Sequence, residues 1–161
     1  MGATVVDTTR IAGRRKLSFA SLDHISADVE KLAAGEVHTL GNWSGGQILK
    51  HLALTMTCSL DGFNVRLALP LRLLGKLMKR RLLTRDMKPG FQLTGPMARA
   101  ILPPDPMEWT EGLTAIRTAL QRLKVEPQRS PSPFLGALTI DEWTQLHCRH
   151  AELHLSFLVI S

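Results

Sequence analysis

The stretch TIDEWTQLHCRHAELHLSF, residues 139–157, predicts an amphipathic α-helix that runs to near the C-terminus. Thr139 and Glu142 have the spacing of a capping box, in which each side chain accepts a hydrogen bond from the other residue's backbone amide. Apolar residues and histidines then recur every three or four positions, at Trp143, Leu146, His147, His150, Leu153, His154 and Phe157. The remaining sequence must therefore supply helices that cover this face.

Three other segments carry the same helical pattern. One begins at Ser21 and ends at Gly35. A second begins at Ser44, which forms a capping box with Gln47, and ends at Gly62. A third follows the helix-start residues 105–108 and places Leu113, Ile116, Leu120 and Leu123 on one face. Four amphipathic helices bury their apolar stripes most simply as a four-helix bundle.

A shorter basic helix is predicted from Pro70, followed by a long Pro- and Gly-rich connection over residues 86–105. Strand signals are weak, and only residues 91–93 and 133–138 could pair briefly, so the predicted class is all-α. The chain has 161 residues, of which 44% are hydrophobic and 21% charged, as in one globular domain. We assign residues 1–20 to an N-terminal lead-in and residues 21–161 to the helical domain.

The compartment is predicted from the cysteines and the apolar runs. The chain has two cysteines, Cys58 and Cys148, which do not make a disulfide framework. Its first residues lack an apolar run of signal-peptide length, and no stretch reaches the roughly 20 apolar residues that cross a bilayer. A cytoplasmic protein is therefore expected.

Positive charge is concentrated in one segment, residues 66–88. The net charge is +6, and this segment holds eight basic residues and one acid, Asp86. Lys79, Arg80 and Arg81 are its candidate anion-binding residues. A basic helix with a leucine stripe fits a membrane surface or another anionic partner, and the cations could instead attract an anionic substrate or thiol cofactor to the protein.

A simpler interpretation of the basic segment is favoured. In it, Leu73, Leu74 and Leu77 pack on the bundle while the cations remain solvated. The segment has no aromatic residue on which a nucleic-acid base could stack. The sequence therefore does not favour nucleic acid or a membrane as the partner.

Three histidines predict a metal site. His150 and His154 have i, i+4 spacing, which places them one turn apart on one helix face. His51 lies on the apolar face of the second helix and is the candidate third ligand. Imidazole nitrogens bind divalent metals such as Zn²⁺ and Ni²⁺, and a three-ligand site keeps a position open for water or substrate. The alternative is that these histidines are packed core residues without a metal.

Other polar residues near these three are assigned supporting roles. His147 shares the helix face of His150 and His154, and Gln47 lies on the same helix as His51. Both are candidates for an alternative ligand or for a hydrogen bond to a ligand. Glu152 should face away from the histidines, and no catalytic base is identified. Cys58 and Cys148 are interpreted as small apolar fillers.

The order of these motifs resembles the DinB/YfiT-like superfamily, in particular an uncharacterised bacterial branch. The likeness spans about Arg14 to Leu158 and is carried by Asn42-Trp43-Ser44, Gly46-Gln47-Ile48, His51-Leu52, Glu142-Trp143 and His150-x-x-x-His154-Leu155. It implies an up-down-down-up four-helix bundle, with an extra short basic helix and a long loop between helices 2 and 3. Members are often dimers.

The resemblance also implies a function. Many members hold Zn²⁺ or Ni²⁺ through one histidine on the second helix and a His-x-x-x-His pair on the last, which here are His51, His150 and His154. Relatives include thiol transferases, a thiol-dependent isomerase and hydrolase-like proteins. The expectation is a divalent-metal-dependent transferase or hydrolase with a small-molecule substrate and a low-molecular-weight thiol as a further cofactor. Phe157 departs from the family pattern, which often has Gln there. The alternative is a non-enzymatic module that uses residues 66–88.

Overall fold

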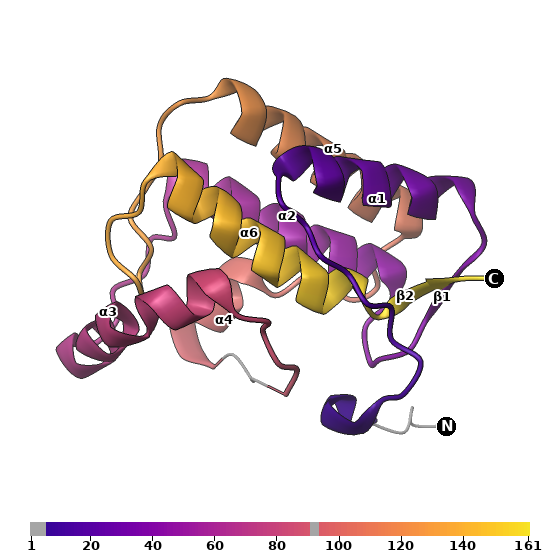
Figure 1. The fold of residues 1–161 in the computed structure, drawn as a ribbon, viewed down its shortest axis with the longest axis horizontal. Coiled ribbons are helices and arrows are strands. Elements are labelled where there is room, and N and C mark those ends of the chain that lie inside the picture. Colours follow the sequence, from indigo (N-terminus) through magenta and orange to yellow (C-terminus); the bar gives the residue numbers. More distant parts are fainter. Residues whose placement is uncertain (1–5, 91–93) are drawn as a thin grey trace.

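The structure is a computed structural model that describes residues 6–90 and 94–161. These residues are mostly helical, as predicted, with six α-helices and one small two-stranded sheet (Figure 1). The helices are α1 (Leu22–Ala34), α2 (Gly45–Asp61), α3 (Leu69–Thr84), α4 (Gly95–Ile101), α5 (Trp109–Val125) and α6 (Ile140–Leu155). The strands are β1 (Val37–Thr39) and β2 (Leu158–Ile160), and a 3-10 turn, η1 (Thr8–Arg10), precedes them.

Both predicted capping boxes are confirmed. At the start of α2, the Ser44 amide donates to Gln47 Oε1 at 2.9 Å and the Gln47 amide donates to Ser44 Oγ at 3.1 Å. The same reciprocal pair of bonds joins Thr139 and Glu142 at the start of α6. Each box satisfies amides that the first helical turn leaves without partners, and it therefore fixes where the helix begins.

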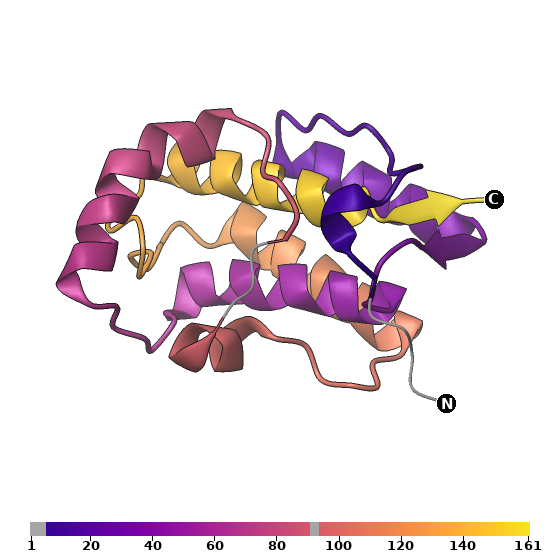
Figure 2. The ribbon, with the colours of Figure 1, turned by 90° about the horizontal axis from the view of Figure 1, so that it is seen from below.

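The core lies between α1, α2, α5 and α6, which lie side by side in Figures 1 and 2. Helix α2 packs along α5 and also contacts α6, while α1 contacts both α5 and α6. Two glycines allow the close approach of α2 and α5, since a Cβ on Gly112 would lie 2.4 Å from the carbonyl oxygen of Gly46. Helix α2, between α5 and α6, carries the largest set of buried residues, including His51.

The described part of the predicted lead-in, residues 6–20, lies against the helices. Arg15 donates to both carboxylate oxygens of Asp28 on α1, at 2.8 and 2.7 Å, and to the carbonyl of Leu155 on α6 at 3.0 Å. Phe19 is buried in the core, and its amide donates to the carboxylate of Glu152. Residues 1–5 of the lead-in lie outside the described residues.

Three short elements differ from the sequence prediction. The connection over residues 86–105 contains helix α4, which the prediction missed. Helix α6 ends at Leu155, and the following residues form β2, which pairs antiparallel with β1 in the register Val37–Ile160. Of the segments predicted to pair, residues 91–93 lie outside the described residues, and the bridge near 133–138 joins Ser132 to Gly136.

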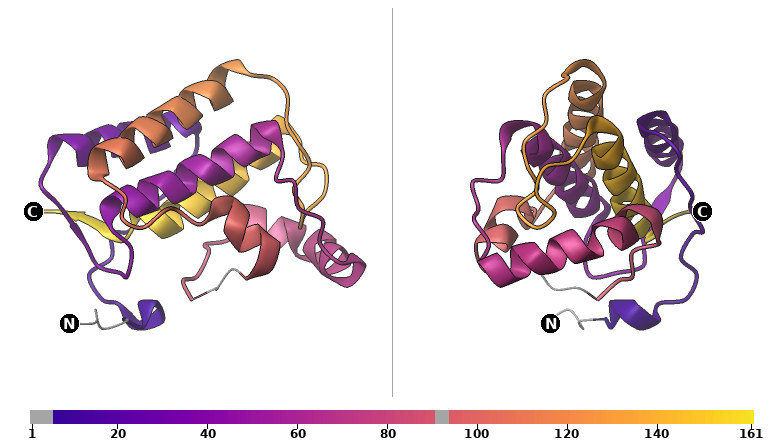
Figure 3. Two further views of the ribbon diagram at one scale, coloured as in Figure 1. Left: turned by 180° about the vertical axis from the view of Figure 1, so that it is seen from behind. Right: turned by 60° about the vertical axis from the view of Figure 1, so that its left-hand side comes forward.

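The predicted packing of α3 is wrong. Leu73, Leu74 and Leu77 face solvent, and the residues that α3 buries are Gly75 and Leu83. At Gly75 the helix meets the loop before α6, where an added Cβ would lie 1.9 Å from the carbonyl oxygen of Phe134. Lys79 also pairs with Glu142 of α6 at 2.7 Å. Helix α3 is thus attached along one face and lies at one end of the molecule (Figure 3).

Candidate metal centre

His51, His150 and His154 come together between α2 and α6. One ring nitrogen from each residue lies within 4.8 Å of the corresponding atoms of the other two, and the three could hold a metal ion. His51 is buried, whereas His150 and His154 are partly accessible. The two α6 residues share a helix face because they are one turn apart, and α2 places His51 opposite them.

The tautomer of His51 is set by a backbone carbonyl. Its Nδ1 lies 2.8 Å from the oxygen of Ile101, the last residue of α4. A carbonyl oxygen only accepts, so Nδ1 carries the proton and donates it. The lone pair of His51 is therefore on Nε2, which points to His150 at an Nε2–Nε2 distance of 3.1 Å.

Thr55 offers Nδ1 of His150 an acceptor. The Thr55 hydroxyl donates to the carbonyl of Leu52 at 2.8 Å, so toward Nδ1 of His150, 3.4 Å away, it acts as an acceptor. In the tautomer with the proton on Nδ1, His150 donates to Thr55 and its lone pair is also on Nε2. The Nε2 lone pairs of His51 and His150 then face each other, an arrangement that a bound cation stabilises, whereas in the other tautomer Nε2 of His150 donates to Nε2 of His51.

Trp43 forms an aromatic wall beside the cluster. Its ring stacks on His154, with centroids 5.8 Å apart and an interplanar angle of 13°, and lies 4.9 Å from the ring of His51. Trp43 directly precedes Ser44, the N-cap of α2, so the capping box also positions this ring. Aromatic contact on one side of the histidines limits how far their rings can rotate.

The three imidazoles are neutral near pH 7. Burial lowers the pKa of His51, and it lowers the pKa of His150 and His154 to well below the usual range. Repulsion between the clustered rings lowers the pKa of His150 further, and that of His154 is also lowered by His51 and Arg14. Neutral imidazole is the form that binds metals.

The structure does not bring His147 into the cluster. Its Nε2 pairs with the hydroxyl of Ser59 at 3.0 Å, and its ring stacks on Trp143 with centroids 5.3 Å apart. Gln47 lies one turn before His51 and donates to the carbonyl of Pro104 at 3.3 Å, on the loop after α4. In these positions His147 supports α2 against α6, and Gln47 holds the loop that follows Ile101.

Neither the cysteines nor the nearby carboxylate belongs to the cluster. Burial raises the pKa of the Cys148 thiol to about 11 and also raises that of Cys58, so both remain protonated near neutral pH. Glu152 faces away from the histidines, as predicted, and pairs with Arg149. Phe157 is buried beneath the guanidinium of Arg14, 4.3 Å from the ring centroid.

Residues 11–161 match the family described as Protein of unknown function (DUF1569). The chain belongs to the DUF1569 family. The match covers all six α-helices and both strands, and with them every residue of the histidine cluster. None of the curated proteins and none of the solved structures matches this DUF1569 chain.

Several residues around the DUF1569 histidine cluster were not assigned a role from the sequence. Trp43 has only the resemblance as a signal, and Thr55 lies among the apolar residues of α2 with nothing in the sequence to mark it. The Ile101 carbonyl has no signal in the sequence, because the bond is made by a main-chain oxygen, which every residue type carries. Lys79 is paired with Glu142, and Arg80 and Arg81 lie on the exposed side of α3.

Proposed function

We propose that this DUF1569 protein binds a divalent metal ion through His51, His150 and His154 and acts as a metal-dependent enzyme. One observation carries the proposal: Nε2 of His51 and Nε2 of His150 lie 3.1 Å apart while Nδ1 of each ring faces an acceptor. With both Nδ1 atoms protonated, the two Nε2 lone pairs are directed at the same point, where one cation can be bound by both.

The residues present fit such an ion. Two nitrogens at about 2.0–2.1 Å from a tetrahedral Zn²⁺ are roughly 3.4 Å apart, close to the observed 3.1 Å. The donor set is three neutral imidazoles, which suits Zn²⁺ or Ni²⁺ better than Mg²⁺ or Ca²⁺, since those prefer oxygen ligands. The hydrogen bonds from Nδ1 to Ile101 and Thr55 supply the outer contacts that metal-binding histidines require.

The proposed reaction class is thiol transfer or hydrolysis on a small molecule. A divalent ion held by three protein ligands supplies Lewis-acid activation at a position left open for water or a thiol. This chain's own contribution is to hold the three rings neutral and oriented, with Trp43 closing one side against solvent.

We also propose that α1, α2, α5 and α6 form a DinB-like up-down-down-up bundle.

Metal content tests the proposal directly. The purified chain is equilibrated with Zn²⁺ or Ni²⁺, freed of excess ion and analysed by plasma mass spectrometry. We expect about one ion per chain, loss of that ion in the His150→Ala/His154→Ala variant, and retention in the His38→Ala control, since His38 is exposed on β1. Chelation should lower the melting temperature of the wild type, because a ligand that binds only the folded state stabilises it.

Two outcomes contradict the metal site. One is a wild-type chain that takes up neither ion and melts at the same temperature with and without chelator. The other is a His150→Ala/His154→Ala variant that retains full occupancy. If the ion is bound, the loss of free thiol in the presence of an electrophile distinguishes thiol transfer from hydrolysis of an ester, and either activity should disappear on chelation.

A further inference from the structure

Helix α3 has a row of leucines that the described part of the chain leaves exposed. Leu77 has 84% of its surface exposed, Leu69 64%, Leu73 52% and Leu74 46%. We call these four residues the outer face of α3. A soluble domain rarely leaves several large apolar side chains together in solvent, and such groups mark interaction sites. The opposite side of the helix is held by Gly75 and Leu83 against the body of the protein.

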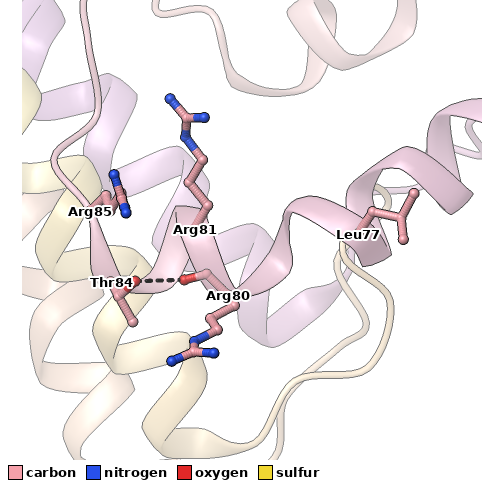
Figure 4. A pocket seen from close by; sticks show the side chains of 5 residues that line it. All are labelled: Leu77, Arg80, Arg81, Thr84 and Arg85. Carbon is pink, nitrogen blue, oxygen red and sulfur yellow. Dashed lines mark hydrogen bonds between the residues drawn. The ribbon is translucent and has the colours of Figure 1, made fainter.

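Cations lie within and beside this outer face. With about 100° of rotation per helical residue, its four leucines span about 140° around α3, from Leu69 to Leu74. Arg80 and Arg81 fall within this arc, one turn beyond Leu77, and Lys76 and Arg85 lie about 20° outside its two edges. Arg80 and Arg81 extend to opposite sides of α3 in Figure 4, and with Arg85, Thr84 and Leu77 they line a surface hollow. Leucines with basic residues beside and just beyond them fit a helix that lies in a membrane interface, where long cationic side chains reach the headgroups.

Most charges of this segment form no ion pair with the described residues. Of the eight basic residues between positions 66 and 88, Lys79 alone forms an ion pair among the residues that the structure describes. The other seven are Arg66, Arg72, Lys76, Arg80, Arg81, Arg85 and Lys88. Their combined positive charge attracts an anionic partner. Long Lys and Arg side chains can reach the phosphates of a lipid headgroup while leucines enter the apolar layer.

We infer that the outer face of α3 docks on an anionic lipid bilayer, with the helix parallel to the membrane plane. No helix in the described residues is long and apolar enough to cross a membrane, so the contact is peripheral. The leucines supply apolar burial in the outer part of the acyl layer, and the cations supply attraction to acidic headgroups. This inference is independent of the metal site.

Two other occupants fit the observations less well. A second copy of the chain, packed face to face on α3, would bring two segments of eight basic residues and one acid against each other. Nucleic acid would satisfy the cations, but it offers nothing to four exposed leucines, and residues 66–88 contain no aromatic side chain for stacking. A bilayer with acidic headgroups matches both the charge and the apolar surface.

Flotation of the full chain with lipid vesicles tests the inference. Vesicles of phosphatidylcholine alone are compared with vesicles of phosphatidylcholine mixed with phosphatidylglycerol. We expect binding to the mixed vesicles only, weakened by added salt because the attraction is electrostatic. Arg80→Gln/Arg81→Gln should weaken binding about 30-fold, at about fivefold for each cation. Leu73→Ser/Leu77→Ser should weaken it at least about tenfold.

Matched controls distinguish an effect of the outer face of α3 from an effect of the protein's total charge or total exposed apolar surface. Lys31→Gln/Arg99→Gln removes two exposed cations from α1 and α4, and Val125→Ser removes an exposed apolar side chain from α5. Both controls should bind like the wild type, and circular dichroism should show every variant folded. The inference is overturned if the wild type ignores the mixed vesicles, if the α3 variants bind as tightly as the controls, or if light scattering shows that the α3 leucines instead hold a dimer together.

Discussion

The hydroxyl of Thr55 lies 3.4 Å from Nδ1 of His150 and donates its own proton to the carbonyl of Leu52. This side chain therefore favours the tautomer of His150 in which Nδ1 is protonated. Thr55 is one turn after His51 on α2, so the same helix supplies one proposed ligand and orients another. A side chain that touches no metal can in this way control the affinity for one.

Replacement of Thr55 by valine keeps the shape of the side chain and removes the acceptor. We expect the affinity for Zn²⁺ to fall about 10- to 100-fold, because His150 loses the bond that fixes its tautomer. Competition with a coloured chelator measures this change. Thr118→Val is the control, since Thr118 also donates to a backbone carbonyl of its own helix but lies exposed on α5. Equal affinities in both variants would show that Thr55 does not orient His150.

Acid should destabilise the metal-free protein through His147. Burial, with a smaller contribution from the charge of Arg129, lowers the pKa of this residue from 6.5 to about 3. Below pH 6.5 the unfolded chain takes up a proton at this position and the folded chain does not, so the free energy of unfolding falls between pH 6.5 and 3. Urea unfolding at several pH values measures the slope.

His147→Gln should give a shallower dependence on pH than the wild type, because one titrating group has been removed. The pKa values of the three cluster histidines are lowered as well, so they change stability in the same direction and some dependence should remain. His38→Gln, on the exposed strand β1, is the matched control. An unchanged slope in His147→Gln would mean that this imidazole is not held neutral by its surroundings.

The attachment of α3 predicts an unusual pair of stability effects. Gly75→Ala adds one methyl group that would lie 1.9 Å from the carbonyl oxygen of Phe134, and we expect it to cost about 1–3 kcal/mol. Leu77→Ala removes a much larger group, yet 84% of the surface of Leu77 is exposed. The loss in free energy of unfolding should therefore stay below about 0.5 kcal/mol. Urea unfolding compares the two, and a larger loss at Leu77 would contradict the position of α3.

The ion pair between Arg15 and Asp28 predicts that the lead-in contributes to stability. Asp28→Asn leaves a partly buried guanidinium without its carboxylate, which should cost about 1–3 kcal/mol. Glu30→Gln is the control, because the pair of Glu30 with Arg117 is exposed and such pairs contribute little to stability. Thermal melting of both variants tests this difference, and equal shifts would mean that residues near Arg15 are not anchored to α1.

The main helices could be predicted because their signals are local. The capping boxes at Ser44 and Thr139 and the glycines at positions 35 and 62 define the ends of helices through bonds within a few residues. Helix α4 and the strands β1 and β2 are short, and their stability comes from tertiary contacts. Such segments have too few residues for a periodic pattern.

The candidate site could be predicted in part for a related reason. The i, i+4 spacing of His150 and His154 follows from helix geometry, and His51 stood out as a polar residue on an apolar face. The roles of Thr55 and Ile101 depend on how α2, α4 and α6 are placed in space. The leucines of α3 were assigned to the wrong side because an apolar stripe indicates which face is apolar and does not identify its partner.

The bond from His51 to Ile101 has a consequence for how the centre responds to movement. Its acceptor is a main-chain oxygen at the end of α4, so no change of side chain at position 101 deletes it, whereas a displacement of α4 would. The hydrogen bond of Nδ1 of His51 therefore depends on the position of α4. Nitrogen chemical shifts of that ring would record any event that moves α4, at a distance from the event itself.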